Sequence, residues 1–211
     1  MRLPRIKPGQ RLFLCGATGS GKSTWMRYYM AHIAQHVLII DTKAEFSDIA
    51  LTTENFKDAI KQVQTERMVA YVPELGENGH AELDDRIGEL HTSVTNICLA
   101  LDEAYALHNS GRCGNGLMSW VTRGRSLKQS LIACSQRPAW VSQMLLSESE
   151  VVGAGRLRLE TDRRKLRDST GCMAFDSMIQ TPYTFRFYDS ASGDTGLFRL
   201  TKQDVNNESK T

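Results

Sequence analysis

Short apolar runs alternate with longer amphipathic segments along this chain of 211 residues. The short runs have the length of buried strands, whereas the longer segments repeat apolar side chains at helical spacing, as Trp25, Met26 and Tyr29 do. Strands that alternate with helices are typical of a layered α/β domain with a mostly parallel sheet. The pattern predicts a single domain of this kind over residues 1–200, followed by a polar tail at 201–211.

The individual elements follow from the same pattern. The predicted strands are Arg11–Cys15, Val37–Ile40, Met68–Val72, Asn96–Leu101, Ser130–Ser135, Tyr183–Tyr188 and Leu197–Leu200. The predicted helices are Lys22–Gln35, Asn55–Gln64, Ala81–Thr92, Leu117–Lys128 and Asp162–Ser169. The glycine-rich stretch Gly111–Gly116 is expected to form a flexible loop.

The composition is that of an ordinary globular protein, with 41% apolar and 24% charged residues. No apolar run approaches the roughly 20 residues that a membrane-spanning helix needs, so no intrinsic membrane segment is expected. Residues 1–11 are basic but lack the apolar core of a signal peptide. The five cysteines form no CxxC pair, which argues against a disulfide framework or a zinc site. We expect a soluble, intracellular chain with cysteines that serve as small buried side chains.

Charge is distributed unevenly along the sequence. Residues 1–40 contain six basic and no acidic residues, and residues 41–103 contain 14 acidic against five basic ones. Residues 123–167 contain ten basic and four acidic residues. The late basic block is able to face a polyanion, although a solvated helix face would have the same composition.

The strongest chemical signal is GATGSGKS, which matches the phosphate-binding pattern G-x-x-x-x-G-K-[ST] between a predicted strand and a predicted helix. Its glycines let backbone N–H groups point at phosphate oxygens, and the helix adds its positive dipole end. Lys22 would supply a charge for the β- and γ-phosphates of ATP, and the Ser23 hydroxyl would ligate Mg²⁺. The nucleotide-binding candidates are Gly16, Ala17, Thr18, Gly19, Ser20, Gly21, Lys22, Ser23 and Thr24.

Three further polar residues follow buried strands. Asp102 comes directly after the run NICLAL and is a candidate second Mg²⁺ ligand, through water. Glu103, the next residue, could polarise a water molecule for attack on the γ-phosphate. Gln136 follows the run SLIACS, and its amide could report on bound triphosphate if that strand lies parallel to the P-loop strand.

Four segments in this order, GATGSGKS, VLIIDTKAEFSD, ICLALDEA and RGRSLKQSLIACSQRP, together resemble the HerA/FtsK superfamily of DNA-pumping ATPases. The resemblance covers roughly Arg11 to Val141. The short chain is most similar to the genome-packaging ATPases of internal-membrane icosahedral viruses. A RecA-like P-loop fold of the ASCE class is implied, with a mostly parallel central sheet flanked by helices. ATP hydrolysis coupled to translocation of double-stranded DNA is implied as well.

Members of this superfamily work as rings, usually hexamers, with nucleotide between subunits. The resemblance therefore implies an arginine that acts on the neighbouring subunit's γ-phosphate, which points to Arg125, with Arg123 second. Arg137 is more suited to structure or DNA contact, and Asp41–Glu45 resembles an acidic strand-end motif of unassigned role. DNA-gripping candidates are the loop around Arg112 and the segment Arg156–Arg167. Expected partners are DNA and a capsid vertex or membrane-associated protein, in the host cytoplasm or in the virion.

Two other functions use the same P-loop. A nucleoside or small-molecule kinase has a suitable length, but kinases need neither the water-activating glutamate at Glu103 nor the amide at Gln136. An ATPase that moves another polymer, in conjugation, secretion or phage assembly, would share every catalytic residue. ATP turnover without an acceptor, and its response to DNA, would distinguish these classes.

Overall fold

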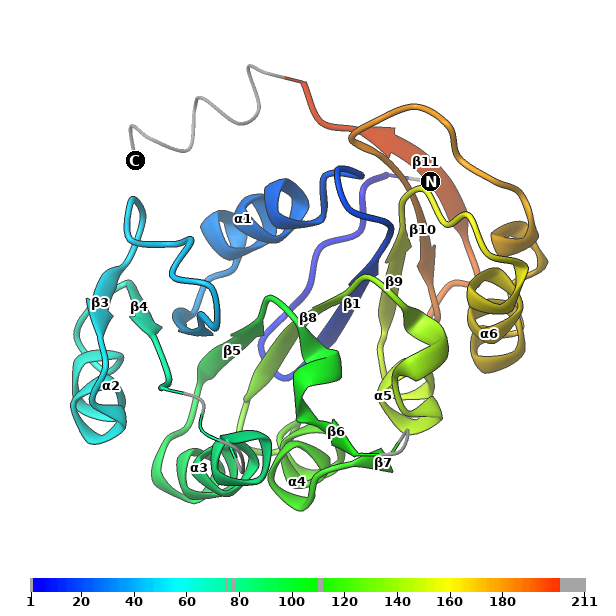
Figure 1. Ribbon diagram of the computed structural model, residues 1–211. Helices are drawn as coiled ribbons and strands as arrows, with labels where there is room; N and C mark the ends of the chain where they lie inside the picture. Colours follow the sequence, from blue (N-terminus) through cyan, green and yellow to red (C-terminus); the bar gives the residue numbers. More distant parts are fainter. Residues whose placement is uncertain (1, 75, 77–78, 110–111, 202–211) are drawn as a thin grey trace.

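A computed structural model describes residues 2–74, 76, 79–109 and 112–201 (Figure 1). The strands of its main sheet are β1 Arg11–Cys15, β2 His36–Ile40, β3 Leu51–Thr53, β4 Met68–Tyr71, β5 Ile97–Leu101, β8 Ser130–Ser135, β9 Val151–Ala154, β10 Thr184–Asp189 and β11 Thr195–Arg199. A separate small hairpin consists of β6 His108–Asn109 and β7 Arg112–Cys113. The helices are α1 Lys22–His32, α2 Phe56–Gln62, α3 Gly79–Ser93, α4 Asn115–Arg123, α5 Gln143–Ser147 and α6 Glu160–Thr170.

Within the described residues, the nine strands of the sheet follow the order β11-β10-β9-β1-β8-β5-β2-β4-β3. From β9 to β3 all neighbours are parallel, whereas β10 and β11 extend the sheet in antiparallel fashion. Strand β1 lies between β8 and β9, with Cys15 in register with Ser135 and with Ala154. The carboxyl ends of β1, β8, β5 and β9 therefore meet along one edge of the sheet, where α/β proteins bind ligands.

Apolar side chains cover both faces of the sheet. On one face α1 packs through Trp25, Met26 and Met30 onto alternate residues of β1 such as Leu12. The opposite face, which includes Phe13, is covered by buried side chains of α2, α3, α4, α5 and α6 (Figure 1). Because the central parallel strands are buried on both faces, their sequences are continuous apolar runs.

Two buried contacts fix the position of α4 against α3. The carboxylate of Asp84 accepts hydrogen bonds from the backbone N–H groups of Gly116 and Leu117, both at 2.9 Å, and thereby caps the first turn of α4. The Cα of Gly116 lies 3.6 Å from the position that a Cβ on Gly88 would take, so glycines allow the two helices to approach closely. The start of α4 is thus held through backbone atoms.

The mostly parallel sheet flanked by helices confirms the predicted fold class. Strand β9, which pairs directly with the P-loop strand, was not predicted, and neither were β3, α5 or the β6–β7 hairpin. The expected loop at Gly111–Gly116 was wrong in part, because it contains β7 and the first residues of α4. Gly111 itself lies outside the described residues, as do residues 202–211 of the predicted tail.

The predicted helices at Lys22–Gln35 and Leu117–Lys128 end earlier than expected. Ile33 adopts an extended conformation after α1, and Gly124 closes α4 ahead of a run of turns. All five cysteines are free, and four of them are buried, as expected for small core side chains. Among the described residues, no helix is both long and apolar enough to cross a bilayer.

Candidate nucleotide-binding site

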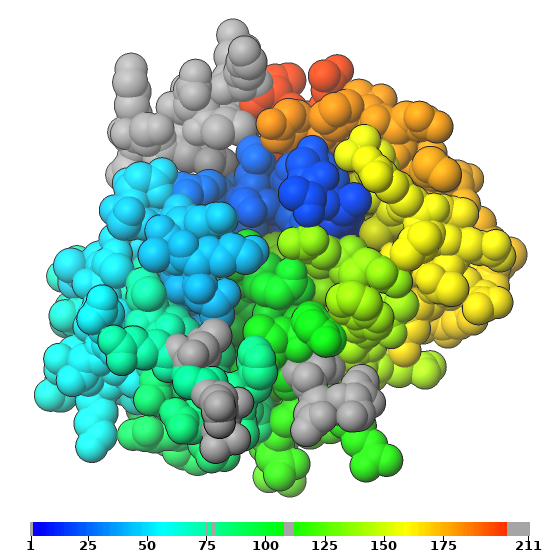
Figure 2. Space-filling model, in the orientation of Figure 1, coloured from blue at the N-terminus to red at the C-terminus, as the bar shows by residue number. Residues whose placement is uncertain are grey.

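The predicted phosphate-binding loop connects β1 to α1 at the carboxyl edge of the sheet. Its first residues are hydrogen-bonded to the ends of both neighbouring strands, since Gly16 N–H donates to the Ser135 carbonyl at 3.3 Å and Ala17 N–H donates to the Arg156 carbonyl at 2.8 Å. The loop tip, Thr18 and Gly19, is exposed. Figure 2 shows the blue surface of this part of the chain at the middle of the visible face, bordered by green and yellow segments. The loop is therefore held from both sides and open to solvent.

Two glycines of the loop are required by its geometry. A Cβ on Gly16 would lie 2.6 Å from the Ser20 hydroxyl oxygen, so a side chain at this position would collide with the loop itself. Gly21, which precedes α1, has a φ of 101°, a left-handed conformation that favours glycine. The Ser20 hydroxyl is buried without a hydrogen-bond partner, as expected for a polar group at a site that takes a polar ligand.

Lys22, Ser23 and Thr24 form the first turn of α1. The Lys22 ammonium donates a hydrogen bond to the Gly16 carbonyl at 2.8 Å across the loop. Burial lowers the pKa of Lys22, and the nearby carboxylates of Glu103 and Asp102 act in the opposite direction. A partly buried ammonium group in the first turn of a helix that follows a glycine-rich loop attracts the phosphates of a nucleotide.

Asp102 follows β5 and is held by a lysine that the sequence analysis did not identify. Its side chain is only 3% exposed, and its Oδ2 lies 2.7 Å from the Nζ of Lys43. Lys43 is brought there by Asp41, whose carboxylate accepts hydrogen bonds from the backbone N–H groups of Glu45 and Phe46 at 3.0 Å. This accounts for the strand-end segment Asp41–Glu45: Asp41 shapes a loop that presents Lys43. The signal in the sequence was a lysine two residues after a buried strand-end aspartate.

Glu103 is a half-buried carboxylate beside Asp102. Burial raises the pKa of Glu103, while a hydrogen bond from Ser135 and the charges of Lys43 and Lys22 oppose this shift. Its Oε1 is buried and has no hydrogen-bond partner. A carboxylate with a raised pKa and a free oxygen is suited to accept a proton from a water molecule.

Gln136 reaches the P-loop from the neighbouring strand. Strand β8 lies parallel beside β1, as is required if Gln136 is to report on bound triphosphate. Gln136 is the first residue after β8. Thr18, at the tip of the loop, donates its hydroxyl hydrogen to the Gln136 amide oxygen at 3.1 Å. Because the oxygen is bound to Thr18, the amide can present its N–H₂ donors to a phosphate.

The chemistry of Ser23 and Asp102 fits Mg²⁺. A hydroxyl and a buried carboxylate are hard oxygen ligands, and Mg²⁺ commonly takes one or two such side chains together with water and nucleotide phosphates. Among the described residues, no cluster of three or more His, Cys, Asp or Glu side chains could hold a metal ion without a nucleotide. When bound, Mg²⁺ would neutralise charge on the phosphates. The Asp102 carboxylate would then interact with both Mg²⁺ and Lys43.

The two arginines predicted to act between subunits lie far from this site within the chain. Arg123 ends α4, and Arg125 lies in the turn between α4 and β8. A guanidinium nitrogen of Arg125 is 3.8 Å from Glu150, which precedes β9 at the amino edge of the sheet. The six residues of β8, about 20 Å of extended chain, separate this edge from the P-loop. Neither arginine can therefore serve the nucleotide site of its own chain.

The other arginines of the basic block have different surroundings. Arg137 is paired with Asp162 at 2.9 Å and lies over the ring of Trp140, so it joins the segment after β8 to α6. Arg163 donates to backbone carbonyls, and Arg167 is paired with Asp168 and Asp176. The remaining exposed arginines of the gripping candidates are Arg158, Arg164 and, on β7, Arg112.

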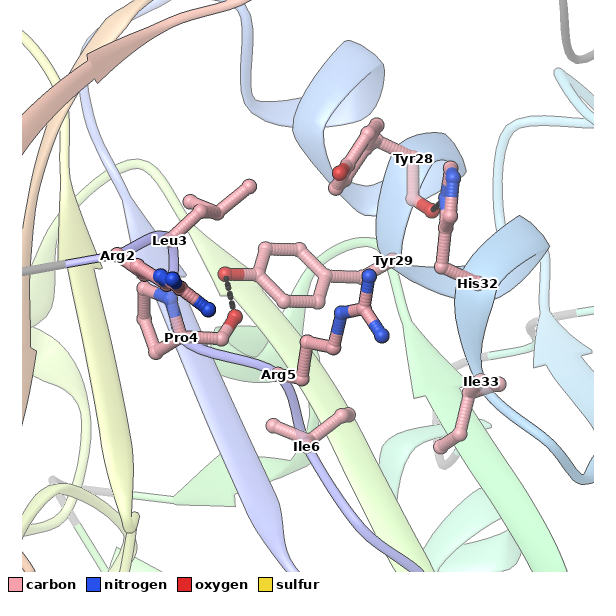
Figure 3. A pocket seen from close by; sticks show the side chains of 9 residues that line it. All are labelled: Arg2, Leu3, Pro4, Arg5, Ile6, Tyr28, Tyr29, His32 and Ile33. Atoms are coloured by element: carbon pink, nitrogen blue, oxygen red, sulfur yellow. Dashed lines mark hydrogen bonds between the residues drawn. The ribbon is translucent and has the colours of Figure 1, made fainter.

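A separate hollow of about 490 Å³ lies between residues 2–6 and the second half of α1. Arg2 and Arg5 border it from the N-terminal segment, and Tyr28 and His32 border it from the helix, where their rings stack 4.2 Å apart (Figure 3). Tyr29 donates its hydroxyl hydrogen to the Pro4 carbonyl at 2.9 Å. The lining of this hollow includes none of the residues of the nucleotide-site candidates.

The chain matches no protein-family profile. It is similar to the DNA packaging ATPase P9 of Enterobacteria phage PRD1, with 24% identity over 170 residues that cover 79% of this chain and 72% of that protein. Its fold is similar to that of the genome packaging NTPase B204 of Sulfolobus turreted icosahedral virus 2, solved with ATP-gammaS. The TM-score is 0.76 at 17% identity, over 92% of this chain and 98% of B204. The chain is therefore similar in sequence to a DNA packaging ATPase, and its fold is that of HerA/FtsK-like P-loop packaging NTPases.

The fold is also similar to that of a conjugation coupling protein. The pCW3 conjugation coupling protein TcpA, in its monomer form with ATPgS, aligns with a TM-score of 0.62 at 16% identity. The alignment covers 95% of this chain and 62% of TcpA. At such identities the two solved structures establish the fold of this chain alone, and the roles of its individual residues depend on the geometry of the site.

Proposed function

We propose that this ATPase translocates double-stranded DNA and packages a viral genome into a preformed capsid. The proposal is supported by the sequence relative, which is a DNA packaging ATPase, and by the fold shared with a genome packaging NTPase. Both similarities extend over most of the chain, 79% of it for the sequence relative and 92% for the solved structure.

The observation that carries the proposal is the position of Gln136. Its amide is hydrogen-bonded to Thr18 at the tip of the P-loop, on the same side of β1 as the half-buried Glu103. An enzyme that transfers phosphate to a second substrate needs no carboxylate to activate water and no amide to sense the γ-phosphate. The arrangement therefore favours hydrolysis of ATP, coupled to mechanical movement, and argues against transfer of phosphate to a second substrate.

Each residue then has a chemical role. Lys22 and the loop N–H groups hold the β- and γ-phosphates, and Ser23 with Asp102 would hold Mg²⁺, which neutralises charge on the phosphates. Glu103 accepts a proton from the water molecule that attacks the γ-phosphorus, while the bond to the β-phosphate oxygen breaks. Gln136 donates to the γ-phosphate and loses this contact when that group leaves.

The proposal includes a homo-oligomeric ring, a hexamer by resemblance, with the nucleotide between subunits. Arg125, or Arg123, would then reach the γ-phosphate of the adjacent subunit. The support for this is that both arginines lie at the opposite edge of the sheet from their own P-loop, too far away to act on the nucleotide of their own chain. An exposed fraction of 70% leaves Arg125 accessible to a neighbour.

DNA is the proposed polymer, and the exposed arginines Arg112, Arg158 and Arg164 are the candidate contacts. A packaging motor must move any sequence, so contacts to phosphates are sufficient. A capsid vertex protein or a membrane-associated protein would anchor the ring, in the host cytoplasm or on the virion.

The test is ATP turnover by the purified protein with and without linear duplex DNA, together with its mass in solution. We expect turnover without any phosphate acceptor, stimulation by duplexes of unrelated sequence, DNA affinity that falls steeply with salt, and an oligomeric mass. Turnover that required a small-molecule acceptor would favour a kinase. Turnover that ignored DNA but responded to another polymer would favour secretion or assembly.

A further inference from the structure

The P-loop has two flanks, and the candidate catalytic residues lie on only one of them. Asp102, Glu103 and Gln136 follow β5 and β8, on one side of β1. A triphosphate whose γ-phosphate faces these residues must direct its nucleoside toward the other side, where β9 and then β10 lie. This inference thus rests on the proposed ATPase function and concerns the end of the nucleotide that does not react.

Tyr183 lies on this second flank, immediately before β10. Because β10 is antiparallel to β9, its first residues lie at the same edge of the sheet as the P-loop. The backbone N–H of Tyr183 donates to the Ser20 carbonyl of the loop at 3.0 Å. The structure therefore attaches this tyrosine to the nucleotide-binding loop, although more than 160 residues separate it from Ser20.

The backbone of Tyr183 is held in an unfavourable conformation. Its φ of 58° is in the left-handed region, which costs free energy for a bulky residue. Besides the bond to Ser20, its carbonyl accepts hydrogen bonds from the Trp25 indole at 3.0 Å and from the Leu200 N–H at 3.3 Å. Three bonds from three separate segments keep the residue in place, and strain of this kind is concentrated at binding sites.

The ring of Tyr183 lies against Gly21, the last residue of the loop before α1. A Cβ on Gly21 would be only 2.7 Å from the Cδ1 atom of the ring, so the glycine and the ring are in direct contact. Tyr183 nevertheless remains 46% exposed. This is unusual for a large aromatic residue whose backbone is held by three hydrogen bonds. A rigid aromatic surface is thus open to solvent beside the phosphate cradle.

We infer that Tyr183 is the stacking surface for the base of the bound nucleotide. A planar ring beside the phosphate cradle, on the flank that the γ-phosphate does not use, is placed to meet a base. Stacking recognises the face of a base and not its hydrogen-bonding edges, so purine nucleotides with different edges bind with similar affinity. The site is therefore a general nucleoside triphosphate site in which the base contributes affinity and little selectivity.

The experiment compares ADP, GDP and inorganic tripolyphosphate as ligands, with Mg²⁺ present, by calorimetric titration of the full chain. The variants are Tyr183→Phe, which keeps the ring, and Tyr183→Asn, which removes the ring with a residue that tolerates the left-handed conformation. Leu197→Asn, an exposed apolar position on β11, is the control. Thermal unfolding of each variant confirms that it is folded.

We expect Tyr183→Asn to weaken ADP and GDP binding about 5- to 150-fold, the range found when a stacking ring is removed. Tripolyphosphate binding should be unchanged, and Tyr183→Phe should match the wild type for all three ligands. Equal losses for ADP and tripolyphosphate would overturn the inference, because Tyr183 would then only support the P-loop. Unchanged ADP binding would also overturn it. Failure of the wild-type protein to bind any of the ligands would instead refute the proposed ATPase.

Discussion

The Nζ atom of Lys43 lies 2.7 Å from the Oδ2 atom of Asp102, although 59 residues separate them in the sequence. Asp102 is nearly fully buried, and the ammonium group of Lys43 supplies the charge that compensates its carboxylate. Asp41 makes this possible, since it binds two backbone N–H groups of the loop that carries Lys43. Lys43 is therefore ion-paired with the carboxylate that the proposed Mg²⁺ ion would bind.

The first prediction concerns Lys43→Met, which keeps the length of the side chain and removes its charge. Without the competing ammonium group, the Mg²⁺ concentration for half-maximal ATPase activity should fall. The nucleotide-free protein should lose about 1 kcal/mol of stability, because Asp102 loses its partner and the half-exposed ammonium group is screened by solvent. Magnesium titrations of activity and denaturant unfolding measure the two effects.

The exposed Lys57→Met variant is the control and should change neither quantity. An unchanged magnesium requirement combined with a large loss of turnover would show that Lys43 contacts the nucleotide and does not compete with the metal ion.

The sequence was sufficient to predict the positions of the P-loop, the carboxylates after β5 and the amide after β8, because each follows a short, uninterrupted apolar run with the length of a buried strand. Strand β9 was missed because it has only four residues and one of them is Gly153. Glycine interrupts the apolar pattern from which a buried strand is predicted. Glycine is needed there because a Cβ would lie 2.6 Å from the ring of Phe187. Such a requirement comes from tertiary packing, which leaves no local signal.

Lys43 and Tyr183 were missed for a related reason. Each acts through a partner that is remote in sequence, Asp102 for Lys43 and the loop residue Gly21 for Tyr183. A pattern of apolar and polar residues reports which face a side chain belongs to, but it does not report which distant loop that side chain meets.

The second prediction distinguishes binding of ATP from its hydrolysis. Lys22→Ala should weaken nucleotide binding and abolish turnover together, because it removes the ammonium group that spans the loop and would neutralise the phosphates. Glu103→Gln should still bind ATP but lose about 10²- to 10⁴-fold in turnover, the usual contribution of a general base. Equilibrium binding of ATP and steady-state phosphate release provide the two readouts. Wild-type turnover by Glu103→Gln would refute the general-base assignment.

The third prediction is a pH dependence of stability at Glu103. Burial raises the pKa of this carboxyl, so the folded protein binds its proton more tightly than the unfolded chain does. The ionised form therefore destabilises the fold at neutral pH, and this cost disappears below the ordinary glutamate pKa of about 4.3. Glu103→Gln should raise the melting temperature at pH 7.5, and the gain should shrink toward pH 4.

Thermal unfolding of both proteins across that pH range is the measurement. The exposed Glu89→Gln variant on α3 should show no comparable gain at pH 7.5. A stabilisation by Glu103→Gln that was equally large at pH 4 would contradict the proposed cause.

The fourth prediction concerns the packing of α3 against α4. A Cβ at Gly116 would lie 1.9 Å from the Asp84 carbonyl oxygen and 2.7 Å from the Gly88 nitrogen, both backbone atoms that cannot rotate away. Gly116→Ala should therefore destabilise the protein by about 2–3 kcal/mol, as overpacking does. Gly76→Ala, where no atom lies within 4 Å, is the matched control. Denaturant unfolding that gave equal stabilities for the two variants would exclude the close helix contact.

The last prediction concerns Arg125, whose guanidinium group lies 3.8 Å from Glu150 at the edge of the sheet opposite the P-loop. If it reaches a neighbour's γ-phosphate, Arg125→Ala should lower ATPase activity by about 10³-fold or more. It should leave ATP binding to the isolated subunit intact. Arg123→Ala, measured in parallel, identifies which of the two arginines carries the effect.

Mixing two inactive proteins then tests whether the arginine acts between subunits. In a mixed ring of Arg125→Ala and Glu103→Gln, some sites combine an intact Glu103 with an intact Arg125 from the neighbour, so activity should partly return. A mixture of Lys22→Ala and Glu103→Gln is the control, because both changes damage the subunit that holds the nucleotide and no intact site can form. Recovery only in the first mixture requires an arginine supplied by the adjacent subunit. A monomer with full activity, or wild-type turnover in both arginine variants, would exclude this mechanism, since β8 separates Arg123 and Arg125 from the P-loop of their own chain by about 20 Å.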